Sequence, residues 1–110
     1  MSEVEKMVMI YSTFPDTATA KEIGGKLVDH ELAACVNIIP QMTSIYRWEG
    51  AVTSDSEVIM LIKTRATLAT KVVAAVEAGH PYDTPAILVF DVANGAKGYL
   101  DWLASATRAN

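Results

Sequence analysis

Two side chains of this sequence, Cys35 and His80, are of the types that bind soft metal ions. Copper and zinc favour thiolate and imidazole ligands. The sequence has one Cys, and its two His are 50 residues apart, so neither a Cys pair nor a His pair has the close spacing of a zinc site and only the fold could bring Cys35 and His80 together. A lone cysteine in a strand is also an ordinary small buried residue, and a histidine in a loop also bonds to the backbone. We therefore take Cys35 and His80 as candidate metal ligands, with a structural role for each as the alternative.

A second group of residues has the chemistry of a small-ligand site. Glu57 and Lys63 are six apart in an apolar stretch. This spacing puts both on one face of a strand but about 20 Å apart, too far to form an ion pair. We expect a cleft between subunits for a small anionic ligand, lined by Tyr46, Trp48, Glu57, Lys63 and Tyr82. The alternative is that these side chains make polar contacts with a neighbouring subunit.

The sequence carries none of the common catalytic signatures. It has no G-x-S-x-G, no phosphate-binding loop and no H-E-x-x-H. Cys35 as nucleophile with His80 as base has no supporting motif. We therefore expect that the protein is not an enzyme.

The composition of the chain indicates its size class, its partners and its location. The 110 residues suit a single domain, 1–110. Hydrophobic residues make up 51% and charged residues 20%, which is apolar for a small monomer and indicates a partner that covers some surface. The net charge is −4 and the basic residues are scattered, so we expect neither nucleic acid nor a membrane surface as a partner. An acidic N-terminus, the lack of any apolar run near the roughly 20 residues of a membrane span, and a lone cysteine predict a cytoplasmic protein.

The elements that must position these side chains alternate at short spacing. Asp16 is a candidate N-cap, Pro40 marks a bulge, Glu49-Gly50 a tight turn, and Gly79 a C′ residue after a helix. Ala20, Ile23, Leu27 and Val28 would form the apolar stripe of the first helix. The expected elements are a strand Val4–Thr13, a helix from Asp16 to about Leu32, a strand Cys35–Trp48, a return strand ending with Glu57–Thr64, a helix Thr67–Ala78, a strand Ala86–Ala93, and a last helix with Tyr99, Trp102, Leu103 and Ala106 on one face.

This order, βαββαβ plus a C-terminal helix, predicts an α+β ferredoxin-like sandwich with a long central β-hairpin. Three strands, Met7–Tyr11, Val58–Ile62 and Ile87–Phe90, are apolar on both faces. A sheet with one face in water should alternate instead, so the last helix and another subunit are expected to cover that face. The hairpin over 36–64 is longer than the other strands can pair, which favours strand pairing with a neighbour and closure of a ring.

Five segments together resemble the CutA family of divalent-ion tolerance proteins. They occur in the expected order and span most of the chain: Ala33–Pro40, Ser44–Gly50, Glu57–Thr64, His80–Pro85 and Tyr99–Trp102. The resemblance implies a ferredoxin-like protomer that forms a homotrimer through its hairpins, like the PII signalling proteins. It also implies a role in the response to metal ions, with copper binding in some members and no established enzymatic activity.

Three positions depart from the family pattern. Some bacterial members carry Cys in the first strand and two His before Pro-Tyr as copper ligands, where this chain has Ser12, Gly79 and His80. Many members have Glu where this chain has Ala86. We therefore expect copper to bind weakly and no cofactor to be required. The preferred interpretation is a trimeric protein that responds to a metal or a small ligand. The alternatives are a stable trimeric module that anchors partner proteins and, less favoured, an enzyme with an intersubunit site.

Overall fold

The computed structural model describes residues 5–109 and shows the predicted order of elements. Val4, where the first strand was expected to begin, lies outside the described residues. The elements are β1 (Met7–Phe14), α1 (Thr17–Asp29), β2 (Cys35–Trp48), β3 (Ala51–Arg65), a 3₁₀ turn η1 (Ala66–Leu68), α2 (Ala69–Gly79), β4 (Ile87–Asp91) and α3 (Lys97–Ser105).

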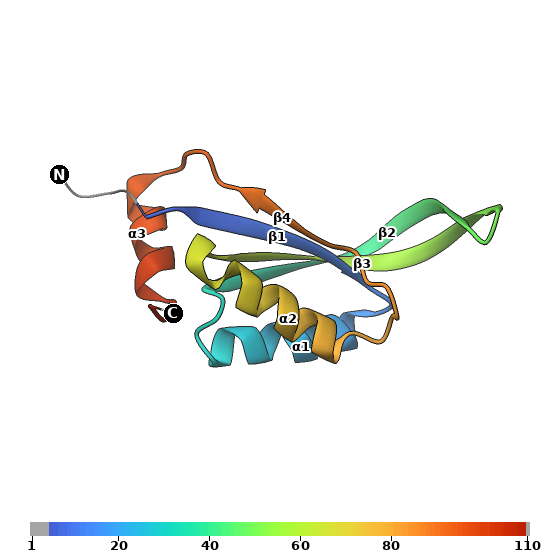
Figure 1. Ribbon diagram of the computed structural model, residues 1–110, viewed down its shortest axis with the longest axis horizontal. Helices are drawn as coiled ribbons and strands as arrows, with labels where there is room; N and C mark the ends of the chain where they lie inside the picture. Colours follow the sequence, from blue (N-terminus) through green and yellow to red (C-terminus); the bar gives the residue numbers. More distant parts are fainter. Residues whose placement is uncertain (1–4, 110) are drawn as a thin grey trace.

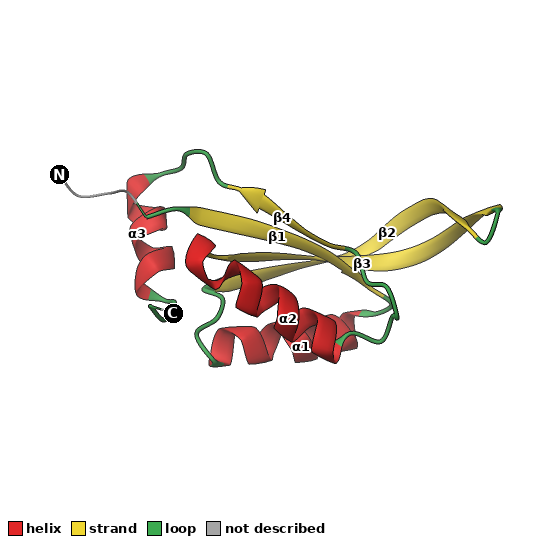
Figure 2. Cartoon of the chain, in the orientation of Figure 1, coloured by secondary structure: helices red, strands yellow, loops and turns green. Residues whose placement is uncertain are grey.

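The four strands form one antiparallel sheet in the order β2-β3-β1-β4, which is the ferredoxin-like arrangement. Helices α1 and α2 cover one face of this sheet (Figure 2). Helix α3 stands at one end, and the β2–β3 hairpin projects from the other end (Figure 1). The predicted α+β class is therefore confirmed.

The hydrophobic core lies between the sheet and the two helices. Alternate residues of β1 and β3 point into it, because successive side chains of a strand face opposite sides. Burying each of these aliphatic side chains contributes about 1.5–3 kcal/mol. The largest buried members are Ile10 and Phe14 of β1, Met60 and Ile62 of β3, Leu68, and Val72 and Val76 of α2.

Helix α1 begins as the sequence predicts. The Asp16 carboxylate accepts a hydrogen bond from the Thr19 backbone N–H at 2.7 Å, and this bond holds the pKa of Asp16 below its usual value. The predicted apolar stripe is wrong at Val28, which is 40% exposed. Gly24 occupies the buried position instead, and a Cβ there would lie 2.9 Å from both Met60 Sδ and Val36 Cγ2. The missing side chain therefore lets α1 approach the sheet.

The second helix differs from prediction at both ends. Its expected first turn forms η1, so α2 starts at Ala69. Gly79 is the last helical residue rather than a left-handed C′ residue, and among the described glycines only Gly50 has a positive φ. The physical reason is Pro81, which disfavours helical geometry at the residue before it, so His80 is extended (φ −76°, ψ 137°) and ends the helix without glycine.

The hairpin has the predicted bulge and turn. The register shifts between Ile39 and Met42, and Gln41 has φ 62°. Glu49 and Gly50 have φ 49° and 80°, as a two-residue hairpin turn requires. Strand β1 pairs with β3 only as far as Val58, so among the described residues β2 is the only strand partner of residues 51–57. The molecule is elongated in consequence, at 54 × 26 × 22 Å.

Strand β4 is shorter than expected and ends at Asp91.

No helix within residues 5–109 is long and apolar enough to cross a membrane.

Candidate functional site

A cleft lies along the outer part of the hairpin, beyond the point where β3 runs past the end of β1. Its volume is about 410 Å³. The hairpin contributes Tyr46 and Trp48 from β2 and Glu57 from β3, and the loop between α2 and β4 contributes Tyr82. The structure therefore brings four of the five predicted ligand-binding residues together within a single chain.

Two phenols of the cleft donate hydrogen bonds to carboxylates of β3. Tyr82 Oη donates to Glu57 Oε2 at 3.0 Å, and Tyr46 Oη donates to Asp55 Oδ2. Burial, followed by this bond and the charge of Glu57, raises the pKa of Tyr82 to about 12. The bond to Asp55 likewise raises the pKa of Tyr46. These bonds orient both rings along the wall of the cleft.

Lys63, the fifth predicted residue, lies elsewhere. It pairs in register with Cys35 of β2 and Met9 of β1, toward the α3 end of the sheet. Its ammonium donates to Tyr99 Oη at 3.1 Å and sits 5.3 Å from the centre of that ring. Lys63 therefore does not line this cleft within the described residues of one chain, and its predicted place in a cleft between subunits stays a prediction.

His80 holds the loop that closes the cleft. Its Nδ1 accepts the backbone N–H of Tyr82 at 3.1 Å, so Nε2 carries the proton and donates to the Thr13 carbonyl at 2.7 Å. The ring also stacks on Phe14, with centroids 4.6 Å apart. Both nitrogens of this candidate metal ligand are therefore engaged by backbone groups of the same chain.

The other candidate metal ligand lies far from His80. Cys35 is half-buried at the start of β2 and pairs with Lys63, whereas Phe14, which His80 contacts, pairs with Val58 in the middle of β3. Five residues of extended strand separate these two positions by about 17 Å. No group of three His, Cys, Asp or Glu side chains between residues 5 and 109 could hold a metal ion. The described residues of one protomer therefore show no converging set of such donors.

Ser12 stands where some family members carry a cysteine, and it has a structural contact. Its buried hydroxyl donates to the Ala86 carbonyl at 2.8 Å. This bond fastens the end of the loop to β1.

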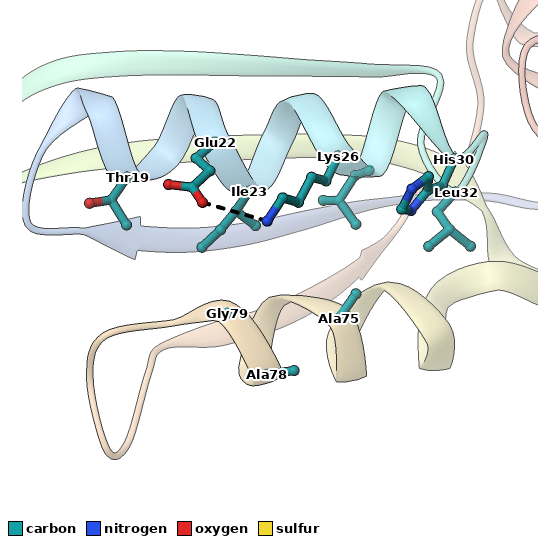
Figure 3. Close-up of a pocket in the computed structure, with 10 residues that line it drawn as sticks. Thr19, Glu22, Ile23, Lys26, His30, Leu32, Ala75, Ala78 and Gly79 are labelled. Carbon is teal, nitrogen blue, oxygen red and sulfur yellow. Dashed lines mark hydrogen bonds and ion pairs between the residues drawn. The ribbon is translucent and has the colours of Figure 1, made fainter.

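A second hollow, of about 420 Å³, lies between α1 and α2 (Figure 3). It exists because α2 presents the small residues Ala75, Ala78 and Gly79 toward α1. The charges on its rim pair with each other, Lys26 with Glu22 at 3.5 Å, and both side chains are about 70% exposed. Since this pair leaves no net charge there, the hairpin cleft is the better candidate site.

Sequence reasoning missed Asp55, Asp83 and Thr84, which also line the cleft. The signal for Asp55 was available, since it lies two residues before Glu57 and so shares its face of β3. Asp83 and Thr84 belong to a loop whose position against the hairpin depends on the whole fold.

These elements define an α+β protein of the ferredoxin-like class, with a central hairpin that runs past its sheet and an aromatic, acidic cleft along that hairpin. Residues 8–106 match the family described as CutA1 divalent ion tolerance protein, and the chain belongs to this family. The divalent-cation tolerance protein CutA of Thermus thermophilus is 44% identical over 94% of this chain and 99% of its own length. The crystal structure of CutA1 from Oryza sativa superposes with a TM-score of 0.94 at 37% identity, covering 99% of this chain and all of the other.

A plant relative is longer than this chain and matches it over only part of its length. The chloroplastic protein CutA of Arabidopsis thaliana is 39% identical over 97% of this chain, which spans 59% of the length of that relative. Its name places it in the chloroplast, so the cytoplasmic location of the present chain remains a prediction.

Proposed function

We propose that this chain serves tolerance to divalent cations as a homotrimer that responds to a metal ion or a small ligand, and not as an enzyme. The observation that carries this proposal is the uncovered apolar face of the sheet. On this face Ile39, Leu88 and Phe90 are 44%, 54% and 50% exposed. A soluble monomer rarely leaves such a contiguous patch in water.

The register shows how continuous this face is. Leu61 of β3, Tyr11 of β1 and Leu88 of β4 lie side by side across three strands, with Met9 and Phe90 paired in the next row. Helix α3 covers only one end, where Leu103 packs with Met7 and Ala34. The remaining surface fits a copy of the same chain.

The hairpin supports a ring rather than a twofold pair. Its outer part extends beyond its own sheet, and β2 is an edge strand. An arm of one protomer that packs on the sheet of the next makes a head-to-tail contact, and such contacts close when they repeat around an axis. Three copies complete the smallest ring of this kind.

Light scattering coupled to gel filtration tests the assembly. We expect a mass of about three times the 11.9 kDa protomer. Leu88→Asp should abolish the trimer, because it places a charge in the apolar face. Val28→Asp, on the exposed side of α1, is the matched control and should leave the mass unchanged. A monomeric wild type contradicts the covered face, and a dimer contradicts the threefold ring.

Copper binding is proposed to be weak. The engagement of both His80 nitrogens and the separation of Cys35 from His80 support this. Calorimetric titration with a competing chelator should give micromolar affinity that His80→Ala and Cys35→Ser barely change. Tight binding that His80→Ala abolishes would contradict the proposal and point to ligands assembled from several protomers.

Tolerance itself is tested by growth. In a bacterial strain that lacks its own CutA, expression of this chain should restore growth at raised copper, and Leu88→Asp should not if the trimer is required. Failure of the wild type to restore growth at equal expression would contradict the tolerance role.

One observation favours the second candidate, a trimeric module that anchors partner proteins. Tyr99 and Trp102 are 43% and 45% exposed on α3, with ring centroids 5.6 Å apart. Tyr and Trp are enriched at protein interfaces relative to the rest of the surface. A partner captured by the wild type and lost with Trp102→Ser, at unchanged trimer mass, would support this alternative over a small-ligand role.

A further inference from the structure

The β2–β3 hairpin contains one extra residue on its β2 side. Two residues of β2, Pro40 and Gln41, lie opposite the single residue Val58 of β3. A bulge of this kind bends its strand and increases the local twist. The hairpin twists where it leaves the sheet (Figure 1). The part beyond the bulge, residues 42–57, is called the arm below.

The bulge lies at the row where the sheet narrows to two strands. Val58 is the last residue of β3 that pairs with β1, and its partner there is Phe14. Among the described residues, those of β3 that precede Val58 pair with β2 alone. A bend at this row therefore changes the direction of the arm and leaves the wider part of the sheet unchanged.

Contacts on both strands hold the arm in its direction. Met42 and Glu57 form the first pair of the arm. Tyr11 of β1 donates a weak hydrogen bond to Met42 Sδ at 4.0 Å, and Tyr82 Oη donates to Glu57 Oε2 at 3.0 Å. Each strand of the arm is thus tied to the body of the protomer directly after the bulge, so the arm leaves the sheet in one defined direction.

The two bulge residues do not favour a straight strand. Gln41 has φ 62°, in the left-handed region that residues other than glycine rarely adopt. Pro40 has no N–H and cannot donate to a regular ladder. The bend is therefore a specific feature of this sequence and does not come from a flexible glycine.

From this placement we infer that the Pro40-Gln41 bulge sets the angle at which the arm meets a neighbouring protomer, and so fixes the number of copies in the ring. The inference rests on the proposed trimer and gives its closure a geometric cause. Head-to-tail contacts form a ring only where the rotation between neighbours closes, and otherwise they form an open filament. The bend determines this rotation because the whole arm lies beyond it.

Removal of the bulge tests the inference. Deletion of Gln41 combined with Pro40→Thr gives β2 and β3 the same number of residues across this row. Ile39 and Met42 then lie two steps apart, so the side chains of the arm keep their faces and their partners. We expect this straightened variant to fold but to lose the mass of three protomers in light scattering. Single chains, open assemblies that grow with concentration, or a ring of another order would each support the inference.

Single substitutions provide the controls. Pro40→Thr alone retains the extra residue, and Gln41→Gly suits the positive φ, so both should keep the wild-type mass. Gln41→Val keeps the chain length, but its β-branched side chain opposes a positive φ. It should make the trimer dissociate at a higher protein concentration than the wild type does, and it provides the test if the straightened variant does not fold.

A monomeric background separates the direction of the arm from the stability of the protomer. In Leu88→Asp, the midpoint of urea unfolding should not fall when the bulge is removed. A fall in this background would show that the bulge supports the fold of the protomer itself, which would overturn the inference.

The masses also distinguish the inference from the proposed function. A straightened variant that keeps the wild-type trimer, with unchanged dissociation on dilution, would overturn the inference and leave the trimeric function standing. A wild type that is not a trimer would overturn both.

Discussion

Tyr82 is the single residue on which the cleft depends most directly. Its phenol joins the loop to β3 through Glu57, and its ring contacts His80 at 4.8 Å between centroids. Two residues on either side of Pro81 thus have complementary tasks, since His80 fixes the loop to β1 and Tyr82 fixes it to the hairpin.

This bond predicts a dependence of stability on alkaline pH. Folding raises the pKa of Tyr82 from 10.0 to about 12, so the folded state favours the neutral phenol. Its contribution to stability is fully present below pH 10 and is lost as the pH rises from 10 to about 12. Urea unfolding at stepped pH should show the difference between wild type and Tyr82→Phe shrinking over that window.

Ultraviolet titration of phenolate provides the matching measurement. Glu57→Gln should shift the Tyr82 phenol part of the way toward its ordinary pKa, because burial, the largest cause of the raised pKa, remains while the negative charge that opposes ionisation is removed. Tyr99→Phe, on α3 and away from the cleft, is the control and should leave that step in place. An unchanged titration in Glu57→Gln would mean that the phenol and carboxylate are not coupled in solution.

At the scale of elements, helix α1 carries two adjacent glycines with opposite roles. Gly24 faces the sheet, where a Cβ would lie 2.9 Å from Met60 Sδ, whereas a Cβ at Gly25 meets nothing within 4 Å. Gly24→Ala should destabilise the protein by about 1–3 kcal/mol through overpacking. Gly25→Ala should stabilise it by up to about 1 kcal/mol, since alanine is the better helix former.

The midpoints of urea unfolding of the two alanine variants, measured in parallel, test this difference in stability. Equal stability of the two would show that α1 can shift away from the sheet at little cost.

The elements that sequence reasoning predicted well are those with local causes. The Asp16 cap, the Pro40 bulge and the Glu49-Gly50 turn each depend on residues within a few positions. Tertiary contacts govern the features that it missed. Val28 was assigned to the apolar stripe because its type fits, but the sheet meets α1 along Gly24 instead. Within one protomer the aromatic residues line the cleft, whereas Lys63 bonds to Tyr99, 36 residues away on α3, so the place of Lys63 in a cleft between subunits stays a prediction.

At the scale of the whole molecule, the elongated shape and the open face of the sheet both support assembly with a neighbouring protomer. The radius of gyration is 15.0 Å, above the roughly 13 Å of a compact domain of this size. The excess comes from the hairpin, and the open face of the sheet provides the surface on which a neighbour's hairpin would pack.

If protomers bury one another in this way, unfolding and dissociation form one coupled event. The thermal midpoint of the wild type should then rise with protein concentration, because mass action favours the assembled state. Leu88→Asp should unfold at a lower midpoint that does not depend on concentration, and Val28→Asp should behave as the wild type does. A wild-type midpoint that stays constant over a hundredfold dilution would contradict the coupling.

Hydrogen exchange at the backbone amides of the outer hairpin should also report whether the protomers are associated. Residues 42–48 pair only with residues 51–57, and two strands alone are marginally stable in water. In a lone protomer these amides should exchange with deuterium through frequent local opening, while those of β1 stay protected. A neighbour packed on the arm would slow them without altering the amides of α1. Exchange rates along β3 would therefore report, residue by residue, whether the interface is occupied. In the dissociated chain exchange should be fast from Ala51 and slow beyond Val58. In the assembled protein this difference should disappear.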